Sequence, residues 1–277
     1  MSADPYREFR EAVDRPEEKI DLGRAALTIA LPDYPELDLE ACLVRLDLLA
    51  QDVADRLGPD AGAFRALAAL NHVLFAQHGF RGNREDYFDP KNSFLNEVLE
   101  RKQGIPITLS VLYMEVAGRV GLKIDGVGFP GHFLVKCAAG GEEIIIDPFN
   151  GGEIKSRSDL ERLLFQAAGG GVGLRDEMLA TTSKKNILRR MLANLKMIYM
   201  SRADWLKCLA ALDRLLIVYP DSAEELRERG AVYLKLDCFP QARADLESYL
   251  RIRPDAEDAA AVREQIARLS KEATQIH

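Results

Sequence analysis

The sequence has no excess of basic residues. Its 277 residues include 37 lysines and arginines against 44 aspartates and glutamates, for a net charge of −7. A surface that binds nucleic acid or an anionic membrane needs clustered Lys and Arg to neutralise phosphate groups. We therefore expect neither nucleic acid nor a membrane among the binding partners of this protein.

A long apolar run is also missing. No segment approaches the roughly 18 uninterrupted apolar residues of a membrane-spanning helix. The N-terminal stretch MSADPYREFREAVDRPEEK is charged throughout and has no apolar core of the kind found in a secretory signal peptide. These two absences predict a cytoplasmic protein. With 47% hydrophobic and 29% charged residues, the chain has the composition of a folded protein with a sizeable core.

Cysteine is scarce, and its spacing carries no chemical signature. The sequence contains no C-x-x-C pair and no cysteine with a histidine nearby at ligand spacing. The four cysteines, Cys42, Cys137, Cys208 and Cys238, are therefore expected to be reduced thiols in the core. The glycine-rich residues 169–173 predict a loop rather than a phosphate cradle, because no P-loop lysine follows them. We expect no cofactor and no metal.

The sequence over positions 1–185 predicts an α+β domain. The expected helices lie at about residues 17–30, 38–57, 61–78 and 106–120, with one more between a cap at Asn92 or Ser93 and a stop at Gly104. The expected strands lie at residues 131–138 and 142–148. The glycine pair at residues 140–141 fits the two-residue turn of an antiparallel hairpin.

This hairpin would bring two chemically active side chains together. If residues 140–141 form the turn, the pairing continues outward until Leu134 faces Asp147. Because strand residues alternate between faces, His132 shares the face of Leu134 and therefore of Asp147. His132 and Asp147 are then diagonal neighbours, and the carboxylate can hold and orient the imidazole. Cys137 points to the opposite face, so it is a poor candidate for a third member.

Beyond residue 185 the pattern is wholly helical and repeats itself. An offset equal to the tetratricopeptide period, roughly 34 residues, aligns Leu192 with Leu226, Tyr199 with Tyr233, Trp205 with Phe239, Leu212 with Leu246 and Pro220 with Pro254. Residues 186–277 therefore predict two tetratricopeptide repeats followed by a capping helix at about residues 256–272. Such a module can present a groove to a protein partner or act as a structural brace.

Three stretches resemble a known family. The helix that ends before Gly121, the segment GHFLV around His132 and the strand that ends at Asp147 are similar to the transglutaminase-like superfamily. The closer resemblance is to its bacterial SirB-type branch, on NSFLNEVLERKQGIPITLSVLY, GVGFPGHFLVK and IIIDPFNGG, and it covers roughly residues 40–155. It implies a papain-like helix plus antiparallel sheet core, a Cys-His-Asp triad and C-terminal tetratricopeptide repeats.

The resemblance implies two members of the triad and lacks the third. His132 matches the family's histidine and Asp147 its aspartate. The family's cysteine, two residues after a glycine and about fifteen before the glycine that ends the helix, falls on Pro106. Proline has no nucleophile, and its fixed φ suits the first turn of a helix. Thr108 and Ser110 supply the nearest hydroxyls, but Thr108 is a weak candidate because it lies about 200° around the helix from Pro106.

The missing cysteine favours a non-enzymatic transglutaminase-like binding or scaffold protein, in which His132 and Asp147 form a structural pair or bind a ligand. A regulatory role fits this interpretation, with a protein partner bound by the tetratricopeptide module. The alternative is a hydrolase or acyltransferase that uses His132 and Asp147 as base and orienter with another nucleophile or an activated water. A third interpretation treats the hairpin as core and places all function in the tetratricopeptide groove.

Overall fold

The computed structural model describes residues 4–58 and 61–275 of the chain. The contacts divide the chain into one unit of residues 11–191 and a second that joins residues 4–10 to residues 192–275. The boundary expected from the sequence, after residue 185, falls at the beginning of helix α8 (Lys184–Ser201) and stays a proposal. Within the described residues, no helix combines the length and the hydrophobicity needed to cross a membrane.

The unit of residues 11–191 has the expected α+β fold. A five-stranded antiparallel sheet has the order β6-β5-β4-β3-β7, and a second, parallel sheet consists of the two short strands β1 and β2. The bounds of the strands are Arg81–Gly82 (β1), Gln103–Gly104 (β2), Asp125–Val127 (β3), Leu134–Ala139 (β4), Glu142–Asp147 (β5), Glu153–Lys155 (β6) and Thr181–Thr182 (β7).

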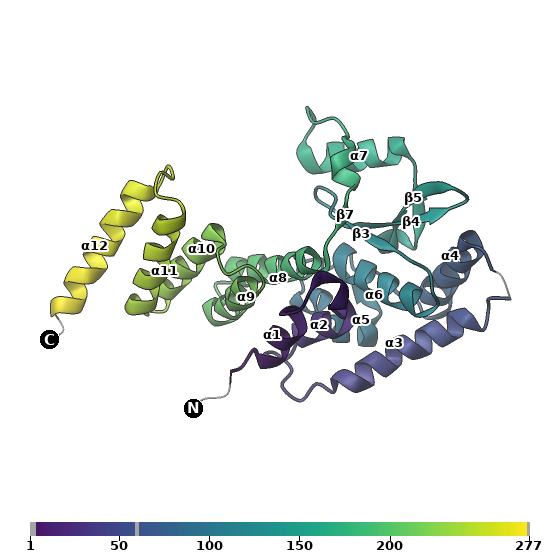
Figure 1. The fold of residues 1–277 in the computed structure, drawn as a ribbon, viewed down its shortest axis with the longest axis horizontal. Coiled ribbons are helices and arrows are strands. Elements are labelled where there is room, and N and C mark those ends of the chain that lie inside the picture. The colour runs from purple at the N-terminus through teal and green to yellow at the C-terminus, as the bar shows by residue number, and fades with distance from the viewer. Residues whose placement is uncertain (1–3, 59–60, 276–277) are drawn as a thin grey trace. The chain divides into compact units, whose positions relative to one another are not determined.

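Helices cover both faces of the larger sheet (Figure 1). The helices of this unit are α2 (Leu22–Thr28), α3 (Leu39–Ala54), α4 (Ala63–Asn71), α5 (Leu95–Arg101), α6 (Pro106–Arg119) and α7 (Arg157–Ala168), and α1 (Arg7–Val13) spans the boundary at residue 10. Helix α6 packs against β3 and β4 and is buried on almost every side. On the opposite face, Leu160 and Leu164 of α7 share a core cluster with Leu134 and Ile145 of the sheet.

Two details of the helical part differ from the sequence expectation. The helix expected over residues 61–78 is α4 followed by a π-helical turn, His72–Gln77. Neither Asn92 nor Ser93 caps α5. Both residues belong to a 3-10 turn, Pro90–Ser93, whose own cap is Asp89, and α5 begins after it at Leu95. The capping prediction failed because the proline at position 90 starts a tighter turn before the helix can begin.

The central hairpin has the expected register. Ala139 pairs with Glu142 across Gly140 and Gly141, and the ladder continues to Val135 and Ile146. Both glycines have positive φ, 64° and 87°, as the two-residue hairpin turn requires. The strand is shorter than expected, because β4 begins at Leu134. His132 therefore lies in the turn before the strand, where its N–H donates to the carbonyl of Phe129 at 3.1 Å.

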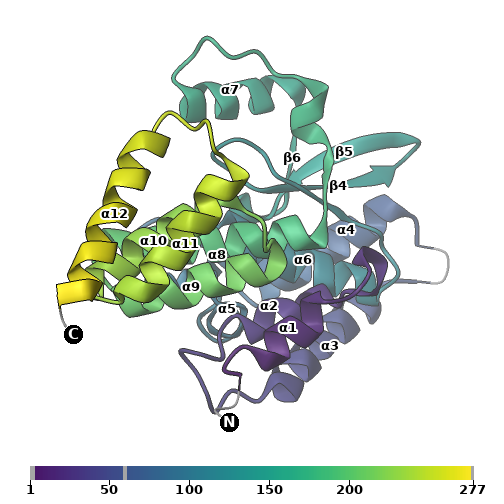
Figure 2. The same cartoon turned by 60° about the vertical axis from the view of Figure 1, so that its left-hand side comes forward.

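The C-terminal part repeats with the expected period (Figure 2). Helices α9 (Trp205–Val218) and α11 (Phe239–Ile252) begin and end at positions related by the tetratricopeptide offset, and α10 (Ala223–Lys235) and α12 (Ala259–Gln275) complete the antiparallel series. The left-handed turn residues Ala203 and Asp237, with φ of 53° and 55°, are related by the same offset. Among the described residues, α8 to α11 thus form two successive helix pairs, and α12 follows them.

The core of the C-terminal unit explains which positions repeat. Leu226, Leu246 and Tyr249 belong to its buried cluster. A Cβ at Gly230 would meet Leu246 at 3.0 Å, so this position favours the smallest residue. At the matching position of the first repeat, Lys196 is buried and pairs with Glu228 instead.

Candidate functional site

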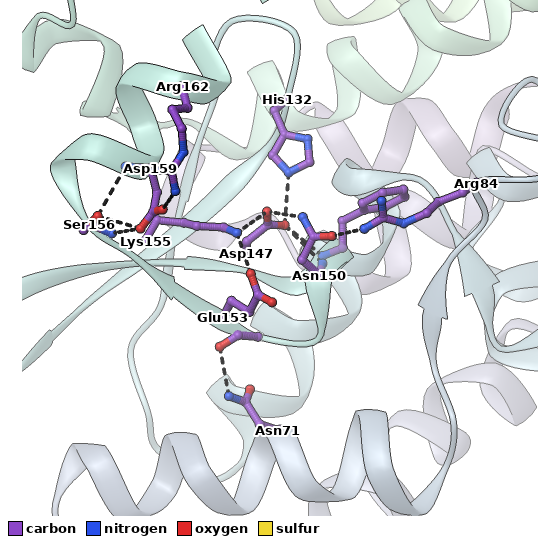
Figure 3. A network of polar contacts seen from close by, with 12 residues as sticks. Asn71, Arg84, His132, Asp147, Asn150, Glu153, Lys155, Ser156, Asp159 and Arg162 are labelled. Atoms are coloured by element: carbon purple, nitrogen blue, oxygen red, sulfur yellow. Dashed lines mark hydrogen bonds and ion pairs between the residues drawn. The ribbon is translucent and has the colours of Figure 1, made fainter. Parts of the chain in front are cut away.

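His132 and Asp147 are in direct contact (Figure 3). Nε2 of the imidazole lies 3.0 Å from Oδ1 of the carboxylate. A neutral ring that donates its Nε2 proton to Asp147 keeps an unshared electron pair on Nδ1. Within the described residues, no hydrogen bond occupies Nδ1. The pair can therefore present an oriented hydrogen-bond acceptor or base. The sequence-based hypothesis assigns these roles to His132 as base and Asp147 as the group that orients it.

The position of His132 depends on a glycine. Gly131 has a φ of +67°, and a Cβ there would come within 2.6 Å of Ala167 on α7. The turn before β4 thus needs both left-handed backbone and close approach to α7, and only glycine meets both conditions at low cost. The histidine side chain that follows is 13% exposed, so the imidazole keeps limited access to solvent.

Asp147 is fully buried and receives several hydrogen bonds. Besides His132, its Oδ1 accepts from the backbone N–H groups of Phe149 at 3.1 Å and Asn150 at 3.3 Å. Its Oδ2 accepts from Nδ2 of Asn150 at 2.7 Å, and Nζ of Lys155 lies 3.5 Å away. Burial by itself raises the pKa of Asp147, but the hydrogen bond and charge of His132, with Asn150 and Lys155, hold it below the ordinary value. The carboxylate is therefore built to stay ionised.

A second layer of contacts holds the residues around Asp147. Arg84 donates to Oδ1 of Asn150 and places its guanidinium 5.5 Å from the centre of the Phe149 ring. The same ring meets the imidazole of His132 edge-on at 5.9 Å. Lys155 also pairs with Glu153 at 2.7 Å. These contacts hold Phe149 and Asn150, the two residues whose N–H groups donate to the carboxylate.

The loop after Asp147 is tied to the helical layer. The side-chain amide of Asn71, at the end of α4, donates to the carbonyl of Gly152 at 3.0 Å. Its Oδ1 accepts from the hydroxyl of Tyr113 on α6 at 2.8 Å. The side chain of Asn71 thus links α4 to both α6 and the loop after Asp147 through hydrogen bonds.

Neither Pro106 nor Thr108, at the beginning of α6, provides a free nucleophile. Pro106 is buried and occupies the first helical position. The hydroxyl of Thr108 is buried, donates to the carbonyl of Asn92 at 2.7 Å and accepts from the N–H of Ile105 at 3.1 Å. Thr108 is therefore a structural residue of the helix start, and its weak candidacy as nucleophile is not supported. The triad implied by the family resemblance would bring His132 and Asp147 close to this end of α6, and that approach stays a prediction.

The thiols of this unit are also unsuited to the role. Cys42 and Cys137 are buried, and desolvation raises the pKa of both. A thiol in such surroundings is rarely ionised and is a poor nucleophile. In residues 4–58 and 61–275, no three His, Cys, Asp or Glu side chains gather as metal ligands.

Reasoning from the sequence missed the residues that surround the pair. Asn150 carried a usable signal, because a polar residue three positions after Asp147 can return to its carboxylate in a tight turn. Arg84, Lys155 and Asn71 carried none, since each reaches the site from another element.

Two family models match the chain. A model described as the transglutaminase-like superfamily matches residues 40–193, and a tetratricopeptide repeat model matches residues 195–267. Together they confirm the expected transglutaminase-like superfamily and the C-terminal tetratricopeptide repeats. No solved structure matches the chain.

Similar proteins occur in bacteria and in mammals. A UPF0162 protein of Xylella fastidiosa is 36% identical over 268 residues, which is 94% of each chain. A UPF0162 protein of Vibrio cholerae is 30% identical over 252 residues, or 91% of this chain and 93% of the relative. F-box only protein 21 of Homo sapiens is 30% identical over 188 residues, covering 64% of this chain and 29% of that protein.

Proposed function

Because the chain belongs to the transglutaminase-like superfamily, we propose that it is a non-enzymatic member that binds partners rather than transferring acyl groups. The superfamily domain and the tetratricopeptide repeats support a scaffold or interaction role. In this proposal the domain performs no covalent chemistry and has a regulatory role. The protein belongs to the SirB-type branch and is located in the cytoplasm.

One observation carries the non-enzymatic part: Pro106 occupies the first position of α6, where the superfamily's thiol is expected. A nucleophile at a helix N-terminus gains from the dipole only if it can ionise there. Proline cannot ionise, Thr108 has its hydroxyl engaged, and the cysteines of this unit are buried. The imidazole of His132, oriented by the ionised Asp147, is then available to hold a ligand through a hydrogen bond.

The ligand that such a pair would accept has a definable chemistry. Nδ1 of a neutral His132 accepts a hydrogen bond, so a bound group must donate one, as an amide N–H, a hydroxyl or an ammonium does. A second candidate function rests on the same atom. With Nδ1 unoccupied within the described residues, His132 could act as base toward a water, and Asp147 would orient it, in a hydrolase that needs no cysteine.

The test restores the nucleophile. In Pro106→Cys, a thiol that meets His132 should have a pKa well below the unperturbed value of about 8.5. Iodoacetamide alkylation of that cysteine, followed against pH by mass spectrometry of its peptide, gives the midpoint. The matched control is Pro106→Cys combined with His132→Ala, which should return the midpoint toward the unperturbed value. An identical midpoint in both variants would show that the two positions do not meet.

The natural protein is assayed in parallel with glutamine-containing peptides and simple amides. We expect no turnover above that of Asp147→Asn. Turnover by the natural protein that is lost in both His132→Ala and Asp147→Asn would overturn the non-enzymatic assignment and favour the hydrolase. Cys42 and Cys137 serve as internal references, because burial should keep their alkylation slow in every variant.

A further inference from the structure

The C-terminal unit contains a cavity of about 620 Å³ that the site around His132 does not involve. Its lining comes mainly from α10 and α12, with Met200 of α8 and Trp205 of α9 as further lining residues. All of its lining residues belong to residues 192–275. A hollow of this size accepts a few side chains of another chain rather than water alone.

The apolar part of the lining is suited to a large hydrophobic side chain. Val232 and Val262 form buried parts of the lining, and Trp205 adds a partly buried ring. Met200 is 37% exposed, although methionine is normally buried when nothing binds it. Methionine and tryptophan together form an adaptable apolar surface of the kind enriched at interfaces.

The charged part of the lining is asymmetric. Each of its three carboxylates already has a cation from the chain itself: Glu228 has Lys196, Asp258 has Arg227, and Glu264 has Arg268. Lys235 also lines the cavity and is exposed, and within the described residues no carboxylate pairs with it. The uncompensated charge of the groove is therefore positive and is located at the last residue of α10.

We propose that this groove binds a segment of a protein partner in which an acidic side chain follows or precedes a large apolar one. The apolar residue packs between Val232, Val262 and Trp205, and the carboxylate pairs with Lys235. This inference rests on the proposed interaction role of the repeats, and it states the chemistry of the partner.

The dimensions set the length of the segment. The lining residues of α10 lie between Arg227 and Lys235, which are eight helical steps apart, or about 12 Å at 1.5 Å per residue. An extended chain covers that distance with about four residues. A side-chain carboxylate fits better than a chain terminus, because a terminal carboxylate calls for several donors and Arg227 and Arg268 are already paired.

The chain contains an intrinsic fluorescent probe for binding. The chain has one tryptophan, Trp205, and it lines the groove. The full-length protein is used to select binders from a library of blocked octapeptides, N-acetylated and C-amidated. We expect enriched peptides to carry Asp or Glu beside Leu, Phe or Met. An enriched peptide should shift the emission of Trp205 in a saturable titration.

Two variants test the assignment of the groove. Lys235→Gln should weaken an enriched peptide about three- to fivefold, the range of an exposed ion pair. Ala231→Glu, which places bulk and negative charge on the exposed groove side of α10, should abolish the fluorescence change. Arg251→Gln is the matched control, because Arg251 is an exposed cation of α11 that does not line the cavity.

The outcomes separate this inference from the proposed function. Enriched peptides without an acidic residue, or equal affinity for the natural protein and Lys235→Gln, would overturn the acidic assignment and leave the interaction role standing. Failure of any peptide to bind would count against both. Far-ultraviolet circular dichroism checks that the variants fold. If Ala231→Glu does not fold, the affinity of Lys235→Gln still decides the test.

Discussion

Asn71 and Gly152 are 81 residues apart in the chain and in contact in the fold, where the amide of one donates to the carbonyl of the other at 3.0 Å. Gly152 has a φ of +78°, and a Cβ placed there would come within 2.1 Å of Oδ1 of Asn71. This contact holds the loop that begins at Asp147. The stability of the His132 site should therefore depend on a residue that touches neither of its functional side chains.

Gly152→Ala should be markedly destabilising. Left-handed backbone alone costs about 1–2 kcal/mol for a residue with a Cβ, and the overlap with Asn71 adds about 1–3 kcal/mol. The control is Gly151→Ala. Its φ of +72° imposes a similar backbone strain, but no atom lies within 4 Å of the added Cβ. Urea unfolding should show the larger loss for Gly152→Ala, and equal losses would mean that the loop moves away from Asn71 without cost.

Acidification should weaken the fold through Asp147. Although burial acts in the other direction, His132, Asn150 and Lys155 hold the folded-state pKa below its ordinary value of 3.8. The unfolded chain then binds the proton more readily. The stabilisation is thus present above the ordinary pKa and is lost as the pH falls through the folded-state pKa.

The comparison variant for this effect is Asp147→Asn, which cannot titrate. The difference in urea unfolding free energy between it and the natural protein should be greatest near neutral pH and shrink below about pH 4. A difference that stays constant down to about pH 2.5 would contradict the lowered pKa.

Thr108→Val should destabilise the protein by about 1–3 kcal/mol, because the N–H of Ile105 and the carbonyl of Asn92 lose a buried partner. Thr108→Ser keeps the hydroxyl and should lose less. Both variants should leave the alkylation midpoint of Pro106→Cys unchanged. A midpoint that moves with Thr108 would return this residue to the candidate site.

In the C-terminal unit, Leu246→Ala should cost about 2–4 kcal/mol, because Leu246 is 2% exposed and packs against Gly230. Leu206→Ala makes the same chemical change at a side chain that is 70% exposed. It should change the unfolding free energy by less than about 0.5 kcal/mol. Similar effects of the two substitutions would mean that the helix pair does not close on Leu246.

Alkylation of the natural protein should modify Cys238 first. Burial raises the pKa of the Cys208 thiol to about 11 and that of Cys42 and Cys137 in the same direction. Cys238 is the least buried of the four. Peptide mass spectrometry after brief iodoacetamide treatment at about pH 8 gives the order, since reaction requires the thiolate. Early labelling of Cys208 would indicate that the repeats open readily.

Local sequence patterns were sufficient to predict those structural features that depend on a short stretch of the chain. The glycine pair at residues 140–141 determined the register of β4 and β5, because a two-residue turn leaves one pairing. That register places Asp147 at the end of β5, where His132, in the turn just before β4, contacts it. The tetratricopeptide period placed the helices of the C-terminal unit, because each repeat is a local helical hairpin.

Only the tertiary structure decided what surrounds those features. Arg84, Lys155 and Asn71 reach the Asp147 loop from separate elements, and no spacing in the sequence records such an encounter. The sequence also did not indicate that Lys235 would lack a carboxylate partner among the described residues. The three carboxylates that line the groove each pair with another cation. The sequence by itself thus indicated the β4–β5 hairpin and the helical repeats, since these depend on local periodicity, whereas the other strands were not anticipated. The long-range packing of side chains decided which charges are buried, paired or left for a ligand.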